Sequence, residues 1–422
     1  METNFRQLVA EQRDERVVYS RTGWVPREQE KALNIQSKMA QIITGVRRSG
    51  KSTLAHRALA GVNYAYVNFD DERFAGVEPK DLDHLLEALY DVYGEFTHLL
   101  LDEIQNVSHW ELFVNRLLRN ELHVVLTGSN SKLLARELAT HLTGRYSIIE
   151  LLPFSFKEFL HVRGVITTAV VTAKEKGRIS RLFAEYMQTG GFPDIIMGET
   201  PASYIQNLFE AIVTRDIIFR HKIRQIRAFR ETASFLTENY SAPVSYNRLK
   251  NIFSLGSENT SKNYVAYLEE AWLLLSLSKF SFKNQERTRN RKIYLVDTAF
   301  AKATGGNFSP NTGRLLENIV FLELFRRSRK SRYELFYHKS NYEVDFVIYS
   351  NSKVQELIQV AVSVSNDAVL RREVRALISA ARELSTTLLT IITQDERDEV
   401  VKNGFTIRIL PVWEWLLNVE II

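Results

Sequence analysis

The sequence predicts an α/β protein that begins with a parallel β-sheet covered by helices on both faces. Two observations carry this prediction. Short apolar runs alternate with amphipathic helical segments between residues 40 and 150, a pattern typical of parallel sheets. One apolar run leads directly into residues 45–53 (GVRRSGKST), and a helical pattern follows at once. Residues 1–40, which precede the sheet, are predicted to be a polar lead-in with a short helix near residue 28.

The length and composition indicate a multidomain protein without a membrane segment. A chain of 422 residues is too long for one ordinary hydrophobic core. The absence of cysteine excludes disulfides and thiolate metal sites. No apolar run is long enough to span a bilayer. The polar N-terminus lacks the apolar core of a signal peptide. We therefore expect a cytoplasmic protein with no membrane partner. The net charge of +5 is modest, but basic residues gather in the second half of the chain.

Residues 45–53 have the G-x-x-x-x-G-K-S spacing of a phosphate-binding loop. Its glycines let successive backbone N–H groups face phosphate oxygens, and the N-terminus of the following helix favours anionic charge. Lys51 is expected to reach the terminal phosphates of a nucleoside triphosphate, and Ser52 is expected to bind Mg²⁺. The predicted nucleotide-binding residues are Gly45, Val46, Arg47, Arg48, Ser49, Gly50, Lys51, Ser52 and Thr53.

Two further strand ends carry residues expected to act on the nucleotide. The apolar run at 98–101 ends in Asp102 and Glu103, a pattern in which the aspartate holds Mg²⁺ and the glutamate polarises the attacking water. Another apolar run leads to Ser129, and polar residues at the carboxyl end of a parallel strand face the ligand crevice. Ser129 is a candidate to orient that water or to contact the γ-phosphate, and Thr127 and Asn130 are the alternatives.

Five segments in this order resemble the AAA-type ATPases of the archaeal-ATPase-like group found in bacteria and archaea: GVRRSGKST, LLLDEIQ, LTGSNSKLL, HLTGRY and LLPFSFKEF. The similarity continues through TGGFPDII, TRDII, LLENIVFLEL and EVDFVI and so spans nearly the whole chain. The resemblance implies that the ligand is ATP, that residues 1–153 form an AAA-type domain, and that Ser129 occupies the sensor position. It also makes Arg145 a candidate arginine finger that acts in a neighbouring subunit of a homo-oligomer. The alternative for Arg145 is a surface salt bridge.

Residues 154–225 are predicted to form a helical lid. Apolar residues recur at helical spacing in 154–162, 179–189 and 202–221. Gly190 and Gly191 mark a turn before Pro193. For Arg215, which lies inside the last of these helices, a surface ion pair is favoured over a contact with the nucleotide.

Residues 226–300 are predicted to form a winged helix-turn-helix, because three helical patterns precede two strands joined by a basic segment. Such a module either places its third helix in the major groove of DNA or packs against a protein. The basic residues of the hairpin, with Lys279 and Lys292 counted among them, favour DNA over a protein or a merely solvated hairpin. The candidate DNA contacts are Asn259, Thr260, Lys262, Lys283, Arg287, Arg289 and Arg291.

Residues 301–422 resemble the restriction-endonuclease-like fold of the PD-(D/E)xK nucleases in their helix–strand–strand–strand–helix–strand order. Those enzymes need a helix glutamate, a strand aspartate and a Glu-x-Lys pair to hold Mg²⁺ and activate water. Glu317 and Asp345 match the first two positions, but Gln359 and Ala361 stand in place of the Glu-x-Lys pair. We therefore predict an inactive α/β module with a vestigial site at Glu317, Asp345 and Gln359.

The sequence as a whole predicts an ATPase that couples the binding and hydrolysis of Mg-ATP to DNA binding or remodelling. Two alternatives stay open at this point. One is a nucleotide-dependent switch that binds protein partners, and the other is an ATP-regulated, Mg²⁺-dependent nuclease. Stimulation of ATP hydrolysis by DNA separates the first hypothesis from the second, and cleavage of DNA identifies the third.

Overall fold

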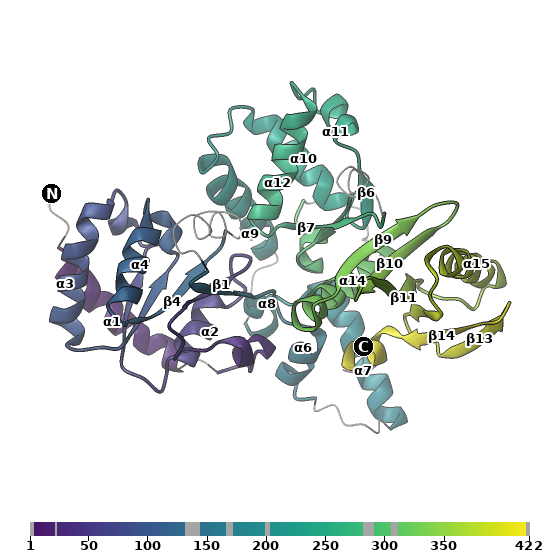
Figure 1. The fold of residues 1–422 in the computed structure, drawn as a ribbon, viewed down its shortest axis with the longest axis horizontal. Coiled ribbons are helices and arrows are strands. Elements are labelled where there is room, and N and C mark those ends of the chain that lie inside the picture. Colours follow the sequence, from purple (N-terminus) through teal and green to yellow (C-terminus); the bar gives the residue numbers. More distant parts are fainter. Residues whose placement is uncertain are drawn as a thin grey trace. The chain divides into compact units, whose positions relative to one another are not determined.

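The computed structural model describes residues 4–21, 23–130, 144–165, 172–198, 203–281, 291–304 and 311–418. The chain forms two compact units, which are Met1–Pro153 with Glu270–Trp272, and Phe154–Glu269 with Leu273–Ile422. Figure 1 shows most of the first unit in purple and blue and the second unit from teal to yellow. Within the described ranges, no helix is long and apolar enough to cross a membrane.

The first unit is built on a five-stranded parallel sheet in the order β2–β3–β4–β1–β5. Strands β1 to β4 are buried along almost their whole length, as expected for a parallel sheet with helices on both faces. This confirms the predicted architecture. The strands are β1 (Ala40–Thr44), β2 (Tyr64–Asn68), β3 (His98–Asp102), β4 (His123–Gly128) and β5 (Tyr146–Glu150).

Each face of this sheet has its own hydrophobic core, because alternate residues of a strand point to opposite faces. Ile42 and Leu99 belong to one core, whereas their neighbours Ile43 and Leu100 belong to the other. The first core includes residues of α1, α3 and α4, and the second includes residues of α2. The helices are α1 (Phe5–Arg21), α2 (Lys51–Ala58), α3 (Leu82–Tyr93) and α4 (Trp110–Arg119), with 3-10 turns at Glu28–Ala32, Glu72–Phe74, Pro79–Asp81 and Ile104–Asn106.

The N-terminal residues differ from the polar lead-in that the sequence predicts. Helix α1 occupies Phe5–Arg21. Its residues Phe5, Leu8 and Val9 are buried in the core on one face of the sheet. This apolar stripe covers little more than one helical turn and is followed by charged residues. The sequence signal for a core helix is therefore weak, and only the packing against the sheet reveals it.

The second unit begins with helices α6 (Phe156–Val162), α7 (Ala173–Thr189), α8 (Pro193–Met197) and α9 (Tyr204–Ala211). The helix predicted over 202–221 changes its winding, because a π-helical stretch, Ile212–Phe219, continues α9. The two glycines of the predicted turn between α7 and α8 meet a conformational and a packing requirement. Gly190 has a φ of 71°, and a Cβ atom on Gly191 would lie 2.2 Å from the carbonyl oxygen of Phe154.

A small antiparallel sheet with three helices follows, in the strand order β6–β8–β7. Its elements are α10 (Ile226–Glu238), β6 (Ala242–Val244), α11 (Tyr246–Ile252), α12 (Glu258–Glu270), β7 (Leu274–Ser278) and β8 (Arg291–Leu295), with a 3-10 turn at Thr298–Lys302. Three helices therefore precede the strand pair β7–β8, in the order that the sequence predicts for this segment.

The C-terminal part of the second unit contains a six-stranded mixed sheet in the order β13–β14–β12–β11–β10–β9. Strands β11, β12 and β14 are parallel to one another, and the other pairs are antiparallel. The edge strand β13 was not predicted, because most of its residues are polar and exposed. The elements are β9 (Glu334–Lys339), β10 (Glu343–Ser350), β11 (Lys353–Val360), β12 (Leu388–Thr393), β13 (Asp398–Lys402), β14 (Phe405–Pro411), α14 (Thr312–Ser331), α15 (Asp367–Leu384) and α16 (Val412–Leu417).

Candidate functional site

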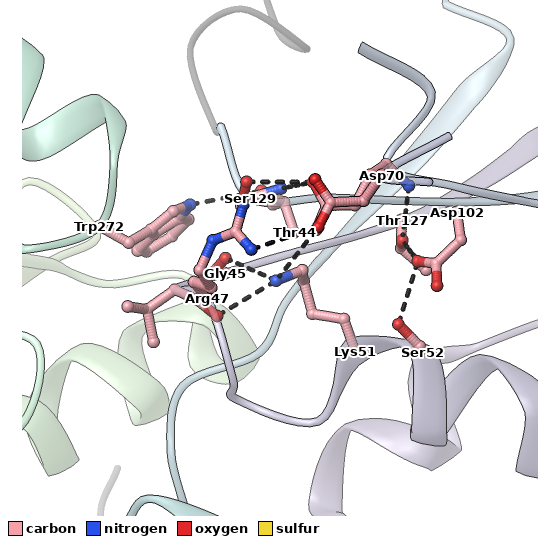
Figure 2. A network of polar contacts seen from close by, with 12 residues as sticks. Thr44, Gly45, Arg47, Lys51, Ser52, Asp70, Asp102, Thr127, Ser129 and Trp272 are labelled. Atoms are coloured by element: carbon pink, nitrogen blue, oxygen red, sulfur yellow. Dashed lines mark hydrogen bonds and ion pairs between the residues drawn. The ribbon is translucent and has the colours of Figure 1, made fainter. Parts of the chain in front are cut away.

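The predicted phosphate-binding loop connects the carboxyl end of β1 to the N-terminus of α2 (Figure 2). Gly45 packs so closely that a Cβ atom there would lie 2.0 Å from the carbonyl oxygen of Leu151. Gly50 is the N-cap residue of α2 and has a φ of 91°, which residues with side chains rarely adopt. The two glycines of the motif therefore serve different backbone needs, one a close approach and the other a left-handed turn.

Arg27, which the sequence did not single out, fixes this loop. Its buried guanidinium donates hydrogen bonds to the carbonyl oxygens of Ser49, at 2.9 Å, and Leu152, at 2.6 Å. These bonds tie the loop to the segment that follows β5. The hydroxyl oxygen of Ser49 is buried without a hydrogen-bond partner in the described part of the chain. A buried polar atom of this kind normally has a partner, so the loop is suited to a polar ligand.

Lys51 lies at the centre of the site. Its side chain is buried, and its ammonium donates hydrogen bonds to the carbonyl oxygens of Gly45, at 3.2 Å, and Val46, at 3.1 Å. The same nitrogen lies 3.7 Å from Oε1 of Glu103. The loop therefore holds a positive charge next to the carboxylate that follows β3, and both groups lie at the edge of the sheet where the motif places phosphates.

Ser52, Asp102 and Thr127 form a second group beside Lys51 (Figure 2). The Ser52 hydroxyl donates a hydrogen bond of 3.0 Å to Oδ1 of Asp102, and the Thr127 hydroxyl donates to the same oxygen. Burial and the nearby charge of Glu103 raise the pKa of Asp102 to about 6. Hydroxyl and carboxylate oxygens are ligands that Mg²⁺ prefers. Ser52 and Asp102 therefore fit a Mg²⁺ ion, whose charge would offset the burial of the carboxylate.

Glu103 is held by hydrogen bonds from two sides. Its φ of 52° is left-handed, and its Oε2 accepts hydrogen bonds from the backbone N–H and the hydroxyl of Ser129, each at 3.1 Å, and from the side chain of Gln105. Burial alone would raise the pKa of Glu103, but the charges of Lys51 and Arg47 and the hydrogen bonds from Gln105 and the Ser129 backbone hold the pKa below its ordinary value. Of the three polar candidates near the end of β4, Ser129 contacts the carboxylate of Glu103. The hydroxyl of Thr127 donates to Asp102 and accepts a 3.2 Å hydrogen bond from the backbone N–H of Glu103.

The two arginines of the loop have different surroundings. Arg47 is partly buried and forms an ion pair with Asp70, at 3.3 Å, whereas Arg48 is exposed and has a φ of 68°.

The indole N–H of Trp272, which belongs to the same compact unit, donates to the hydroxyl of Thr44 at 3.3 Å (Figure 2). Asp70 and Trp272 lie far from the loop in the sequence, and no local pattern predicts these contacts.

Arg145 lies at the opposite end of the sheet from the phosphate-binding loop. It is exposed and directly precedes β5, where its carbonyl oxygen accepts a 3.0 Å hydrogen bond from the N–H of Ala40. The register pairs Ala40 with Tyr146 and Thr44 with Glu150, so the length of β1, about 13 Å, separates Arg145 from the loop. Arg145 therefore does not act in the site of its own subunit, and its role in a neighbouring subunit stays a prediction.

The candidate DNA contacts are only partly within the described residues. Asn259 and Lys262 are exposed on α12, and Thr260 is partly exposed. Lys262 forms an ion pair of 3.0 Å with Glu258 on the same helix. Arg291 at the start of β8 lies 3.4 Å from Oε1 of a glutamate of α12. Lys283, Arg287 and Arg289 lie outside the described residues.

The residues of the predicted vestigial nuclease site come together in the second unit, around a lysine. Glu317 of α14 and Asp345 of β10 each lie 3.2 Å from the ammonium of Lys292. The prediction that Lys292 adds to a basic surface was therefore wrong, because its side chain is buried. Gln359 accepts a hydrogen bond from the N–H of Asp345 and donates one to Glu373. As the side chains are arranged here, with Lys292 in place, the described residues contain no group of three or more His, Cys, Asp or Glu that could hold a metal ion.

Comparison with known proteins identifies the first domain and the family. Residues 37–160 match the family model described as an AAA domain, and residues 180–311 and 312–415 match two domains of unknown function, DUF8612 and DUF4143. The chain is 33% identical over 395 residues to the uncharacterized protein MJ1544 of Methanocaldococcus jannaschii, an alignment that covers 90% of this chain and 88% of MJ1544. The chain belongs to the same family as MJ1544.

Other similar proteins include an uncharacterized protein of Haemophilus influenzae, 31% identical over 341 residues, with 76% of this chain and 82% of that protein covered. The solved Walker-type ATPase PABY2304 of Pyrococcus abyssi is 14% identical, with a TM-score of 0.42 and coverage of 67% of this chain and 96% of that one. The AAA-domain match includes the phosphate-binding loop, Asp102, Glu103 and Ser129. This member of the MJ1544 family therefore contains a nucleotide-binding P-loop ATPase domain.

Proposed function

We propose that this protein hydrolyses ATP in its first unit and couples hydrolysis to the binding or remodelling of DNA by its second unit. The observation that carries the hydrolysis proposal is the position of Glu103. One carboxylate oxygen lies 3.7 Å from the ammonium of Lys51, and the other accepts two hydrogen bonds from Ser129. A carboxylate held between the lysine of a phosphate-binding loop and an orienting hydroxyl is suited to activate water near the terminal phosphate.

Lys51, Ser52 and Asp102 bind the nucleotide and its metal in this proposal. Mg²⁺, held by Ser52 and Asp102, would neutralise charge on the phosphates. The ammonium of Lys51 now contacts two carbonyl oxygens of its own loop, and we propose that it exchanges them for terminal phosphate oxygens when ATP binds. The backbone N–H groups of the loop and the N-terminus of α2 favour the same anionic ligand.

Glu103 accepts a proton from the attacking water, and Ser129 keeps the carboxylate in the orientation that this transfer needs. The neighbouring positive charges hold Glu103 in its ionised form, which is the form that accepts a proton. Arg145, which is exposed and far from the loop of its own subunit, stabilises the transition state in a neighbouring subunit. A homo-oligomer is therefore part of the proposal.

Replacement of Glu103 by glutamine tests the assignment of the base. The amide keeps the shape of the side chain but accepts no proton, so we expect ATP hydrolysis to fall by about 100-fold or more. ATP affinity is expected to stay close to that of the wild type. Glu87, which is exposed on α3, offers a matched Glu→Gln control that should leave hydrolysis unchanged. Turnover of Glu103→Gln at the wild-type rate would show that another group is the base.

The DNA part of the proposal rests on the segment from α10 to β8. Its three helices and antiparallel sheet support the proposal of a winged helix, a module whose third helix reads the major groove. Asn259 and Lys262 are exposed on that helix, α12, while Tyr264 and Leu268 are buried. The second unit would then consist of a lid at 154–225, a winged helix at 226–300 and a nuclease-like module at 301–422.

The rate of ATP hydrolysis with and without duplex, single-stranded and branched DNA tests this coupling. We expect at least one DNA form to stimulate hydrolysis. Replacement of Arg287 and Arg289 by glutamate should weaken DNA binding and reduce its dependence on salt, because fewer phosphate contacts release fewer counterions. Lys174 and Lys176, exposed on α7, offer a matched double charge reversal as a control. DNA binding and hydrolysis that are both indifferent to these changes would favour a protein partner.

A further inference from the structure

The carboxylate cluster of the second unit encloses a single lysine. Lys292 projects from β8 with only 3% of its side chain exposed. Its ammonium lies 2.7 Å from Oε1 of Glu343, 3.2 Å from Oε1 of Glu317 and 3.2 Å from Oδ1 of Asp345. The four residues come from three elements, because Glu317 lies on α14 and the other two carboxylates lie on β10. One buried cation is therefore shared by three acidic side chains.

Further contacts hold these carboxylates in place. Oδ2 of Asp345 accepts a 3.0 Å hydrogen bond from the N–H of Val360. Oε1 of Glu317 also accepts a 2.7 Å hydrogen bond from the hydroxyl of Tyr294, and Oε2 of Glu343 lies 3.1 Å from the ammonium of Lys339. Burial lowers the pKa of Lys292, but the three carboxylates together hold that pKa above its ordinary value. The lysine is thus charged and lies where these carboxylates meet.

Gln359 is turned away from a role as a cation ligand. Its carbonyl oxygen accepts a 3.2 Å hydrogen bond from the N–H of Asp345, and its amide donates a 2.7 Å hydrogen bond to Glu373 of α15. Both ends of the amide are therefore engaged in the protein itself. A neutral amide in this position also removes one negative charge that a bound divalent cation would need.

We propose that the ammonium of Lys292 takes the place that a divalent metal ion would occupy between Glu317, Glu343 and Asp345. Carboxylate oxygens gathered around a point suit either a hard metal ion or an ammonium, which is a compact point charge. Three carboxylates held this close together without a cation would repel one another, and those that are buried would also lose hydration. The lysine relieves both effects and leaves no room for the metal. The module is thus metal-free, and Lys292 ties the three-stranded sheet to α14 and the six-stranded sheet.

Replacement of Lys292 by methionine tests this proposal, because it removes the cation and leaves the carboxylates. We expect Lys292→Met to have a lower melting temperature than the wild type. Millimolar Mn²⁺ should raise the melting temperature of this variant by about 5 °C, because Mn²⁺ binds to the folded state. Binding of Mn²⁺ is also measured by the loss of the electron paramagnetic resonance signal of free Mn²⁺, in nucleotide-free protein. Lys292→Gln serves as a second variant if the methionine variant does not fold.

Two controls assign the effect to this cluster. Lys339 contacts the same Glu343 but is 55% exposed, so Lys339→Met should leave the response to Mn²⁺ at the wild-type level. The double variant Lys292→Met with Asp345→Asn should lose the gain, because one ligand is gone. Two results would overturn the proposal. In the first, the wild type binds Mn²⁺ and Asp345→Asn abolishes this binding. In the second, the Lys292 variants fold, but Mn²⁺ raises their melting temperature no more than it raises that of the wild type.

Discussion

The variant Ser129→Ala removes one hydroxyl group, which donates a 3.1 Å hydrogen bond to Oε2 of Glu103. Hydrogen bonds to charged groups contribute about 1.5–3 kcal/mol. If this bond orients the carboxylate for proton transfer, its loss lowers kcat by about 10- to 150-fold, since 1.36 kcal/mol corresponds to a factor of ten. The backbone N–H of Ser129 keeps its own 3.1 Å bond to Glu103. We therefore expect the lower part of that range, a decrease of about 10- to 30-fold.

The assay is phosphate release at saturating Mg-ATP, with ATP affinity measured separately on the same preparations. The hydroxyl contacts Glu103 and no phosphate-binding residue, so ATP affinity is expected to change by no more than about twofold. Ser129→Thr keeps a hydroxyl and should retain most of the activity, which separates the hydrogen bond from a packing effect. A kcat of Ser129→Ala within about twofold of the wild type would refute the role of this hydroxyl.

Three further predictions concern the first unit. Gly45→Ala places a Cβ atom 2.0 Å from the carbonyl oxygen of Leu151, so the loop must shift. We expect the variant to lose ATP binding and its free energy of unfolding, measured in urea, to fall by about 1–3 kcal/mol. Unchanged ATP affinity would contradict the close packing at Gly45. Arg145→Ala and Lys51→Ala should each lack activity, but a mixture should regain part of it, because some interfaces then pair an intact loop with an intact arginine. Recovery no greater than the sum of the separate variants would contradict a role of Arg145 in trans. Burial lowers the pKa of His56 from 6.5 to about 3, so below pH 6.5 the unfolded state binds a proton that the folded state does not. The free energy of unfolding should therefore fall by about 2 kcal/mol between pH 7 and pH 5. Urea titrations at both pH values should show that His56→Gln lacks this contribution to the decrease. If the decrease is the same in His56→Gln, other groups cause it.

The arrangement of the first unit follows from local patterns in the sequence. The apolar runs at 98–101 and before the phosphate-binding loop predict buried parallel strands, and the sheet has that form. The loop, Asp102, Glu103 and Ser129 follow strand ends in the sequence. Because the strands are parallel, these ends meet at one edge of the sheet. The sequence alone therefore predicts which residues meet there, but not which hydroxyl contacts which carboxylate.

Other features depend on residues that are distant in the sequence. Arg27 contacts the loop from more than twenty residues away in the sequence, and Trp272 contacts Thr44 from 228 residues away. Helix α1 carries too short an apolar stripe to be recognised as part of the core. In each case the partner, and not a repeating local pattern, determines the position of the side chain.

The phosphate-binding loop and the buried strands of the first unit can be predicted from the amino-acid sequence, because each depends on residues close together in the chain. The same holds for Gln359 and Ala361, which stand where the nucleases that the C-terminal sequence resembles need a Glu-x-Lys pair. The position of Lys292 could be found only from the three-dimensional fold. In the sequence it looks like one more basic residue of an exposed hairpin, whereas in the fold it is buried among three carboxylates. The physical reason is that a buried charge requires partners of opposite charge, and here strand and helix pairing brings those partners from 25 to 53 residues away.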